Sequence, residues 1–308
     1  RIIAELILSR FWLRSRSIDL VYSYFGFAWI PRNVKQVVGA ADSNLFFPEI
    51  DFWKSDKGFR RLKRYLVDEY RKFGLRRANH VIFENVSMME RAESLLGLVN
   101  TSYVKPSIIY GNSTLNFDYP KLDARLVTGL FLCGWHTNKN VLIIPRLIKA
   151  CAVRGVKLTI NFSASYDGSP LSNEFEEIVD ELGVRDSINM MGSIAKEDLP
   201  SVYKASDVVF LLSALESFSN NIIEAWTFKR FLIISDEEWS RSICDSAAIY
   251  VSRNDPSKIA SELLGLIQEK RIRTKVEYAA EEALVSYPSI YERINAELQL
   301  IKSLVRKG

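Results

Sequence analysis

The sequence predicts an α/β fold made of two doubly wound, Rossmann-like domains with parallel strands. A chain of 308 residues, 48% apolar and 25% charged, is long enough for two ordinary globular domains. From Leu126 onward, short β-branched runs alternate strictly with helical patterns, which is typical of a parallel sheet covered by helices. The first part of the chain has the same pattern in a less complete form.

The six strands expected after Leu126 are nearly continuous apolar runs, as in sheets buried on both faces. Their sequences are LVTGLFLC, GVKLTINF, SINMM, DVVFLLS, FLIIS and AAIYVS. Helical patterns fall between or after them, at residues 140–153, 172–182, 196–205, 219–229, 237–245 and 255–270.

The first part of the chain contributes a second, shorter set of strands. These are IDLVYSYF, VKQVVGA, ANHVIFEN and SIIYG, with amphipathic helices before and between them. The sequence starts inside a helical pattern, RIIAELILSRFW, with no strand and Gly-rich turn before it. We therefore expect the first βα units of this domain to be missing from the sequence.

A stretch without periodicity, residues 110–123, is rich in Asn, Gly, Ser, Pro and Asp and is the expected linker. The domains are accordingly 1–112 and 113–286, with a final helix, 287–308, crossing back to the first domain. The apolar residues of that helix recur every three or four positions, so we expect this stripe to dock on the protein. They are Ile290, Ile294, Leu298, Ile301 and Val305.

Composition excludes several classes of protein. No apolar run approaches the roughly 18 residues of a membrane-spanning helix. Cys133, Cys151 and Cys244 are far apart and lack the spacing of a zinc site or disulfide framework, which favours a reducing, cytoplasmic setting. The positive charge is local: nine Lys or Arg against two acids give residues 57–77 a net +7, while the remaining chain is −3.

The stretch LESFSNNIIEAW, residues 215–226, is the strongest candidate for chemistry. It joins a buried strand to a helix, so it lies at the carboxyl edge of the sheet, where such folds bind ligands. The helix start favours a phosphate, and Glu216 and Glu224 can accept hydrogen bonds from sugar or ribose hydroxyls. Spacing alone leaves an alternative open, in which Asn221 and Glu224 form a capping-box-like start and Glu216 is a solvated acid.

The surrounding sequence resembles the donor domain of the retaining GT-B glycosyltransferases of family four. The resemblance rests on ASDVVFLLSALESFSNNIIEAWTFKRFLIISD, with GSIAKEDLPSVYKASD before it and DSAAIYVSRNDPSKIA after it. It covers most of residues 125–306 and is most specific over 190–260. VKQVVGAADSNLFFPE and RRANHVIFENVSMMERAESLLG look like the acceptor domain of that family.

The resemblance implies a donor site for a nucleoside-diphosphate sugar. Glu216 would contact the transferred sugar, and Glu224 the ribose hydroxyls. The remaining donor-binding residues implied are the backbone of Ser217, Phe218, Ser219 and Asn220, the nucleobase turn of Gly192, Ser193 and Ile194, and Gly134, His136 and Lys139 of the loop CGWHTNKN.

That loop departs from the family pattern. Lys139 and Asn140 match the family's Lys-Asn pair, but Trp135 or His136 stands where an Arg is expected. Lys139 is therefore the predicted catalytic cation, neutralising the leaving diphosphate. His136 is either a substitute donor or a cap of the loop, and we favour the cap.

No Asp-x-Asp pair occurs in the chain, so no metal site is predicted for the diphosphate. The resemblance implies metal-independent transfer without a cofactor, and retention of configuration by front-face attack. A protein nucleophile is then not required. Of the two histidines, His80 is expected to be structural.

The basic segment 57–77 is amphipathic, with Phe59, Leu62, Leu66, Tyr70 and Phe73 at helical spacing. It predicts a contact with an anionic membrane surface, and the alternative is a helix docked by this stripe to its own sheet. No nucleic-acid-binding motif accompanies it, so no nucleic-acid partner is expected.

Three aromatic side chains of SNLFFPEIDFW, namely Phe46, Phe47 and Trp53, are either an acceptor wall or core. The function expected is that of a cytoplasmic glycosyltransferase, peripheral on the inner face of the membrane. It would act on a saccharide acceptor, lipid-linked, in polysaccharide or glycoconjugate synthesis. A non-catalytic GT-B-like subunit and, further off, a nucleotide-sugar epimerase are the alternatives.

Overall fold

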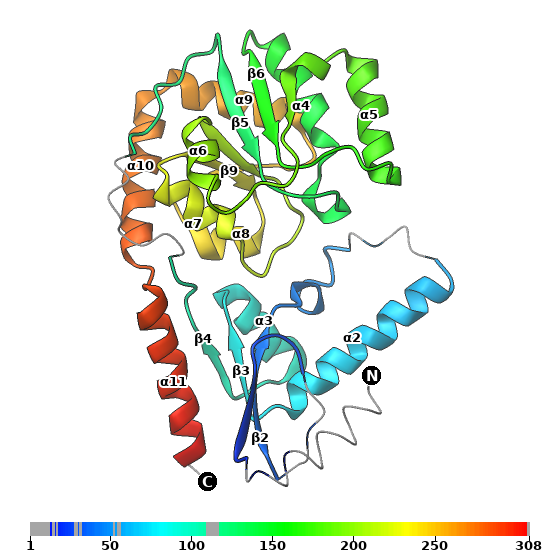
Figure 1. Cartoon of the computed structure of the whole chain (residues 1–308), viewed down its shortest axis with the longest axis vertical. Helices are drawn as coiled ribbons and strands as arrows, with labels where there is room; N and C mark the ends of the chain where they lie inside the picture. The colour runs from blue at the N-terminus through cyan, green and yellow to red at the C-terminus, as the bar shows by residue number, and fades with distance from the viewer. Residues whose placement is uncertain are drawn as a thin grey trace. The chain divides into compact units, whose positions relative to one another are not determined.

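The computed structural model describes residues 13, 16, 18–27, 30, 33–51, 53, 57–108 and 117–306. The chain forms two compact units (Figure 1). Unit 1 comprises residues 1–108 and 287–308, and unit 2 comprises residues 109–286. The expected helix RIIAELILSRFW and much of the expected linker lie outside the described residues.

Unit 1 contains a parallel sheet of four strands in the order β1-β2-β3-β4. The strands are β1 (Leu20–Ser23), β2 (Lys35–Ala40), β3 (His80–Phe83) and β4 (Thr101–Tyr103). Its helices include α2 (Phe59–Arg77), α3 (Val86–Leu96), α11 (Ile290–Arg306) and the short 3₁₀ turn η1 (Ser43–Leu45). Phe46 and Phe47, completely buried, belong to its core rather than to an acceptor wall.

The fourth strand of unit 1 was expected in the wrong place. The run SIIYG was predicted as a strand, but its described residues 107 and 108 have no regular structure. The strand is β4, whose Thr101 pairs with Val81 of β3. Its three residues form no apolar run, because this strand lies at the edge of the sheet and is only partly buried. His80 is structural, as expected, since its Nε2 lies 2.9 Å from Ser102 Oγ of β4.

The predicted final helix is present as α11, but the expectation that its apolar stripe docks on the protein is wrong. Ile290, Ile294 and Leu298 remain 45–47% exposed. The inward face instead carries Arg293 and Glu297, which are close to 10% exposed. This face was not apparent in the sequence because it is polar.

The polar face of α11 binds the sheet of unit 1 directly. Arg293 pairs with Glu84 after β3 at 2.6 Å, and Tyr22 of β1 donates to Glu297 at 3.1 Å. Lys35 Nζ, at the start of β2, donates to the Leu304 carbonyl at 2.7 Å. Charged hydrogen bonds therefore hold α11 in place of the predicted apolar contact.

Unit 2 contains a parallel sheet of six strands in the order β10-β9-β8-β5-β6-β7. The strands are β5 (Val127–Phe131), β6 (Leu158–Phe162), β7 (Ile188–Met190), β8 (Val208–Leu211), β9 (Phe231–Ser235) and β10 (Ile249–Val251). Every predicted strand of this part of the chain is present. The central strands are fully buried, which explains their continuous apolar sequences.

A glycine at the centre of β5 allows the core of unit 2 to close. A Cβ on Gly129 would lie 2.6 Å from both Ile160 Cδ1 and a ring carbon of Phe210. Neither neighbour is a flexible exposed chain, since both are completely buried. Any larger residue would therefore displace the core between β5, β6 and β8.

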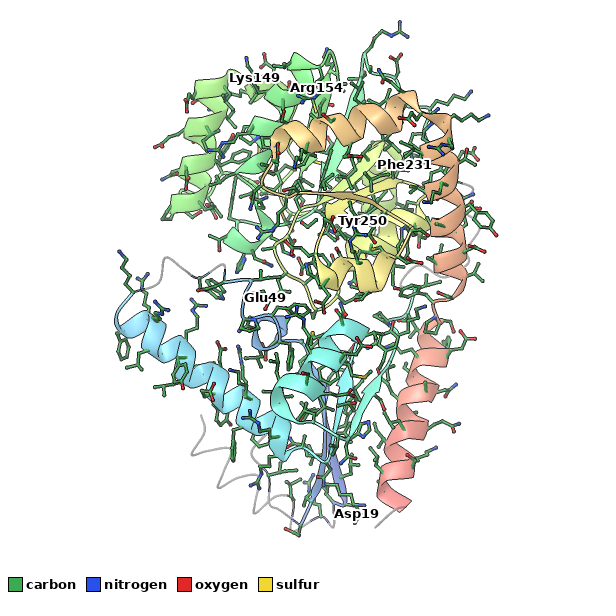
Figure 2. All side chains as sticks on the ribbon, turned by 180° about the vertical axis from the view of Figure 1, so that it is seen from behind. Asp19, Glu49, Lys149, Arg154, Phe231 and Tyr250 are labelled. Atoms are coloured by element: carbon green, nitrogen blue, oxygen red, sulfur yellow. The ribbon has the colours of Figure 1, made fainter. Side chains whose placement is uncertain are left out.

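Most helices of unit 2 connect successive strands, and the last two follow the final strand, β10. They are α4 (Ile143–Val153), α5 (Pro170–Leu182), α6 (Leu199–Lys204), α7 (Asn220–Thr227), α8 (Glu238–Cys244), α9 (Pro256–Gln268) and α10 (Lys270–Val285), with the 3₁₀ turns η2 (Thr137–Lys139) and η3 (Arg185–Ser187). Only α10 was not predicted. Arg154, at the end of α4 and labelled in Figure 2, donates to Ser257 and Ser261 of α9.

Candidate functional site

The candidate site lies where the strand order of unit 2 reverses. Strands β5 and β8 are neighbours, but the chain leaves β5 toward β6 on one side and leaves β8 toward β9 on the other. The loops after β5 (132–142) and after β8 (212–219) thus meet at the carboxyl edge of the sheet. This is the position at which open α/β sheets form a crevice for ligands.

An ion pair joins these two loops. Lys139 Nζ lies 2.5 Å from Glu216 Oε1, and the two side chains are 29% and 13% exposed. The structure therefore brings together the two residues that the sequence predicted as catalytic. Glu216 is not the solvated loop acid of the alternative interpretation, because a cation and the protein surround most of it.

Asn138 holds the two loops in register and was missed in the sequence. Its side-chain amide donates to the Leu215 carbonyl at 2.7 Å and accepts from the Leu215 N–H at 3.0 Å. Its own carbonyl accepts from the Ala214 N–H at 2.8 Å. Lys139 and Glu216 are the next residues along each loop, so this clamp positions both. Only its place between two candidate residues could have identified it in the sequence.

Side chains from the next strand and helix fix the β8 loop from the other side. Ser235 Oγ, at the end of β9, donates to the Ser213 carbonyl at 2.7 Å. Trp239 Nε1, on α8, donates to the Ala214 carbonyl at 3.1 Å. The backbone approaching Glu216 is thus hydrogen-bonded at consecutive residues, as a preorganised site requires.

Helix α7 begins immediately after this loop. Its N-cap is Ser219, which makes no side-chain cap hydrogen bond. Asn221 instead donates to the Leu132 carbonyl at the end of β5, at 3.1 Å. The capping-box alternative is therefore wrong: Asn221 lies inside the helix and binds the neighbouring loop. The Ile222 N–H donates to the Ser219 carbonyl at 3.1 Å, so the N–H groups of Asn220 and Asn221 are the ones that can meet an anion.

Glu224 lies one turn into α7 and is only 6% exposed. It accepts a hydrogen bond from the hydroxyl of Tyr203 on α6, at 2.8 Å. Burial raises the pKa of Glu224, while the Tyr203 hydrogen bond and the positive charge of Lys196 act in the opposite direction. Tyr203 and Lys196 were not singled out from the sequence, although both lie in the stretch that carries the family resemblance.

The remaining predicted residues lie in several loops at the same edge of the sheet. Ser217 and Phe218 are half-buried in the β8 loop, and Ser219 and Asn220 begin α7. In the turn after β7, Gly192 has a φ of 70° and its N–H donates to the Ala164 carbonyl. Such a φ favours glycine.

Ser193 is exposed and Ile194 half-buried, and both precede α6. Tyr203 of α6 connects this part of the unit to Glu224. The turn of residues 192–194 and the Lys139–Glu216 pair are separate parts of this edge, because β7 and β5 lie two strands apart in the sheet.

The loop after β5 explains the departure from the family pattern. The Trp135 indole donates to the Ser165 carbonyl at 2.8 Å and packs edge-on against Phe162 and Phe175. Trp135 therefore has a structural role and supplies no charge. The Nδ1 of His136 accepts from the Asn138 N–H at 3.1 Å, so His136 caps the turn η2 as we favoured. Gly134, before them, is exposed.

Within the described part of the chain, no group of three or more His, Cys, Asp or Glu side chains could hold a metal ion. No helix among the described residues is both long and apolar enough to cross a bilayer. The charged groups on which the site is built are Lys139 and Glu216, which form one pair, and Glu224 with Lys196 near it.

Known proteins resemble this part of the chain in sequence. The sequence model of the family glycosyl transferases group 1 matches residues 144–283. Mannosylfructose-phosphate synthase of Agrobacterium fabrum is 42% identical over 53 residues, which are 17% of this chain and 12% of that protein. The match thus spans a small part of this curated relative.

Solved structures resemble the whole chain. A sucrose-phosphate synthase from Thermosynechococcus elongatus has a TM-score of 0.75 at 14% identity, over 96% of this chain and 76% of its own. A glycosyltransferase from Rickettsia africae has a TM-score of 0.71 at 13% identity, over 100% of this chain and 82% of its own. Anabaena Alr3699/HepE, in complex with UDP-glucose, has a TM-score of 0.66 at 15% identity, over 93% of this chain and 78% of its own. These likenesses confirm the predicted GT-B fold.

Proposed function

We propose that this chain, whose residues 144–283 match the glycosyl transferases group 1 family, transfers a sugar from a nucleoside diphosphate to a hydroxyl group of a saccharide. The observation that carries the proposal is the Lys139–Glu216 pair at the reversal of strand order, beside the start of α7. A cation, a carboxylate and a helix N-terminus suit the diphosphate and the hydroxyls of such a donor.

Each group has a separate role in this proposal. Lys139 neutralises the charge that develops on the leaving diphosphate, and the first N–H groups of α7 bind its oxygens. Glu216 accepts hydrogen bonds from the transferred sugar. Glu224, oriented by Tyr203, accepts them from the ribose. The HepE structure is a complex with UDP-glucose, which favours a donor of the same class here.

Transfer without a metal ion and with retention of configuration is part of the proposal. Lys139 and the helix start supply the positive potential that a metal would otherwise provide. The leaving phosphate oxygen takes the proton of the attacking hydroxyl, so no carboxylate has to act as a base. Addition of a chelator should then leave the rate unchanged, whereas strong inhibition would contradict this mechanism.

For the acceptor, we infer a lipid-linked saccharide of a cell-surface polysaccharide or glycoconjugate. The enzyme would then be cytoplasmic and peripheral on the inner face of the membrane. The local charge of +7 over residues 57–77 supports this inference. The proposed sugar transfer does not depend on this choice of acceptor.

Donor binding can be tested by thermal unfolding with UDP, GDP, ADP or dTDP and their sugar adducts. A nucleotide present at a hundred times its dissociation constant should stabilise the protein by about 2.7 kcal/mol. Lys139→Met and Glu224→Ala should each reduce the shift, while Lys149→Met, on the exposed surface of α4, should not. If no nucleotide raises the transition temperature of the wild type, the donor site is disproved.

A transfer assay with the wild-type protein distinguishes an enzyme from a non-catalytic subunit. Trp135 or His136 occupies the position where the family has an Arg, so a reduced or absent activity is the relevant alternative. A nucleotide sugar that stabilises the chain should release labelled sugar to a membrane extract. Binding without any transfer or hydrolysis would instead favour the non-catalytic subunit.

A further inference from the structure

The first half of α2 is exposed on nearly all sides. Residues 57–67 contain five Lys or Arg and no acid, and all of them except Arg64 are exposed. Its apolar side chains are unusually accessible, with Phe59 78%, Leu62 54% and Leu66 58% exposed. A soluble protein has no energetic reason to place such a series of apolar groups in water.

The orientation of α2 shows which face is presented outward. Arg64 lies over the Trp53 ring, 3.6 Å from its centroid, and Leu75 is buried in unit 1. Residues eleven positions apart lie on the same side of a helix, so Arg64 and Leu75 mark the inward side. Leu66 lies two positions from Arg64 and projects almost opposite, with Phe59 and Leu62 beside it.

The second half of α2 is packed against the protein, so the predicted membrane segment 57–77 is restricted to its first half. Gly74 has no room for a side chain, because a Cβ there would lie 2.4 Å from the Phe27 ring. Phe27 also contacts Tyr70 and Phe73 edge-on. The alternative of a docked helix is therefore correct for the last turns of α2 and wrong for the first ones.

We propose that residues 57–67 are a docking surface for an anionic phospholipid bilayer, into which Phe59, Leu62 and Leu66 insert. An outward apolar face bordered by cations is what a helix lying in a membrane interface presents. Arg60 and Lys63 border this face, and the structure gives neither an acidic partner among the described residues. Charge complementarity favours anionic lipid over a neutral apolar partner. This proposal is based on the geometry of α2 and does not depend on the proposed sugar transfer.

Binding to vesicles tests this surface directly. The full chain should sediment with vesicles of phosphatidylglycerol and phosphatidylcholine, and should remain in solution with phosphatidylcholine alone. Raising the salt concentration should weaken binding, because the attraction is partly electrostatic. Arg60→Glu with Lys63→Glu should lower the partition coefficient by roughly tenfold or more.

Apolar insertion requires its own pair of variants. Leu62→Gln with Leu66→Gln should also reduce partitioning, and Gln keeps the helix propensity of Leu. The matched controls are Leu95→Gln with Leu298→Gln, on exposed positions of α3 and α11, and Lys149→Glu with Lys157→Glu in unit 2. The controls should bind vesicles as the wild type does. Circular dichroism establishes that each variant is folded.

Two results with vesicles would overturn the proposal: failure of the wild type to bind anionic vesicles, and equal binding by the α2 variants and the controls. Sedimentation equilibrium without lipid tests another occupant: a dimer that Leu62→Gln with Leu66→Gln abolishes would show that a second copy of the chain covers this face. Nucleotide-induced stabilisation should be unchanged in the α2 variants, which separates this surface from the donor site.

Discussion

Helices α7 and α2 differ sharply in burial. Helix α7 has eight residues, and five consecutive ones, from Ile222 to Trp226, are buried. Helix α2 has 19 residues, of which only Gly74 and Leu75 are buried. The short helix is thus held by its surroundings and the long one mainly by its own hydrogen bonds and side-chain propensities.

This difference separates two ways of supporting a function. A donor site requires groups held in position, and α7 obtains this from Asn221, Glu224 and Trp226, each hydrogen-bonded to another element. A surface for a mobile partner requires accessible side chains, which the first half of α2 supplies. Substitutions should therefore change stability in α7 and leave it almost unchanged in the first half of α2.

The largest contrast is expected between two aromatic residues. Trp226→Ala should lower the free energy of unfolding of unit 2 by about 3–5 kcal/mol, because it leaves a cavity and removes the hydrogen bond to the Ala247 carbonyl. Phe59→Ala should change stability by about 0.5 kcal/mol or less, since that ring is 78% exposed. Urea unfolding measures both. Equal losses would show that α2 is packed against another part of the protein.

Asn138 extends the comparison to the loops beside α7. Asn138→Ala should lower the free energy of unfolding by about 1–3 kcal/mol, because the buried N–H and carbonyl of Leu215 lose their hydrogen-bond partner. Nucleotide affinity should fall about tenfold as Lys139 and Glu216 lose their alignment. Titration calorimetry and urea unfolding give the two values. Asn173→Ala, on the exposed surface of α5, is the control, and unchanged nucleotide affinity in Asn138→Ala would refute the positioning role.

A pH dependence follows from the buried carboxyl group of α7. Burial raises the pKa of Glu224 above its ordinary value of 4.5, so the folded protein keeps this proton to a higher pH than the unfolded chain does. The contribution of Glu224 to stability is therefore greatest below pH 4.5 and falls as the pH rises through the folded-state pKa.

Glu224→Gln should remove this fall. Its melting temperature relative to the wild type should increase as the pH rises from 4.5 through the folded-state pKa of Glu224, and its nucleotide affinity should be lower than that of the wild type. Glu262→Gln, an exposed position on α9, is the control. A constant difference from the wild type across this range would show that the burial of Glu224 has no effect on its titration.

The smallest effect is expected in α2. Val67→Ala should stabilise the protein by about 0.5 kcal/mol, because Ala has the higher helix propensity and Val67 is exposed. Thermal unfolding at high salt concentration, without lipid, measures this difference. A loss of stability would mean that Val67 packs against a neighbour.

Much of unit 2 could be predicted from the sequence because its signals are local. Continuous apolar runs such as DVVFLLS identify buried strands, and the intervening helices follow from their periodicity. Glu216 and Glu224 could be selected because both lie at a junction of strand and helix. In unit 1 the edge strand β4 was missed, since three partly buried residues leave no periodic pattern.

The sequence by itself determined the six strands of unit 2 and most of its helices, and it identified the carboxylates and the lysine that lie near strand ends. The tertiary structure alone decided that Lys139 and Glu216 meet, because β5 and β8 are neighbours despite the long stretch of chain between them. It also decided that α11 docks by Arg293 and Glu297, and that the apolar face of α2 points outward. Periodicity records that a helix has two faces, but which face is buried depends on contacts between distant parts of the chain.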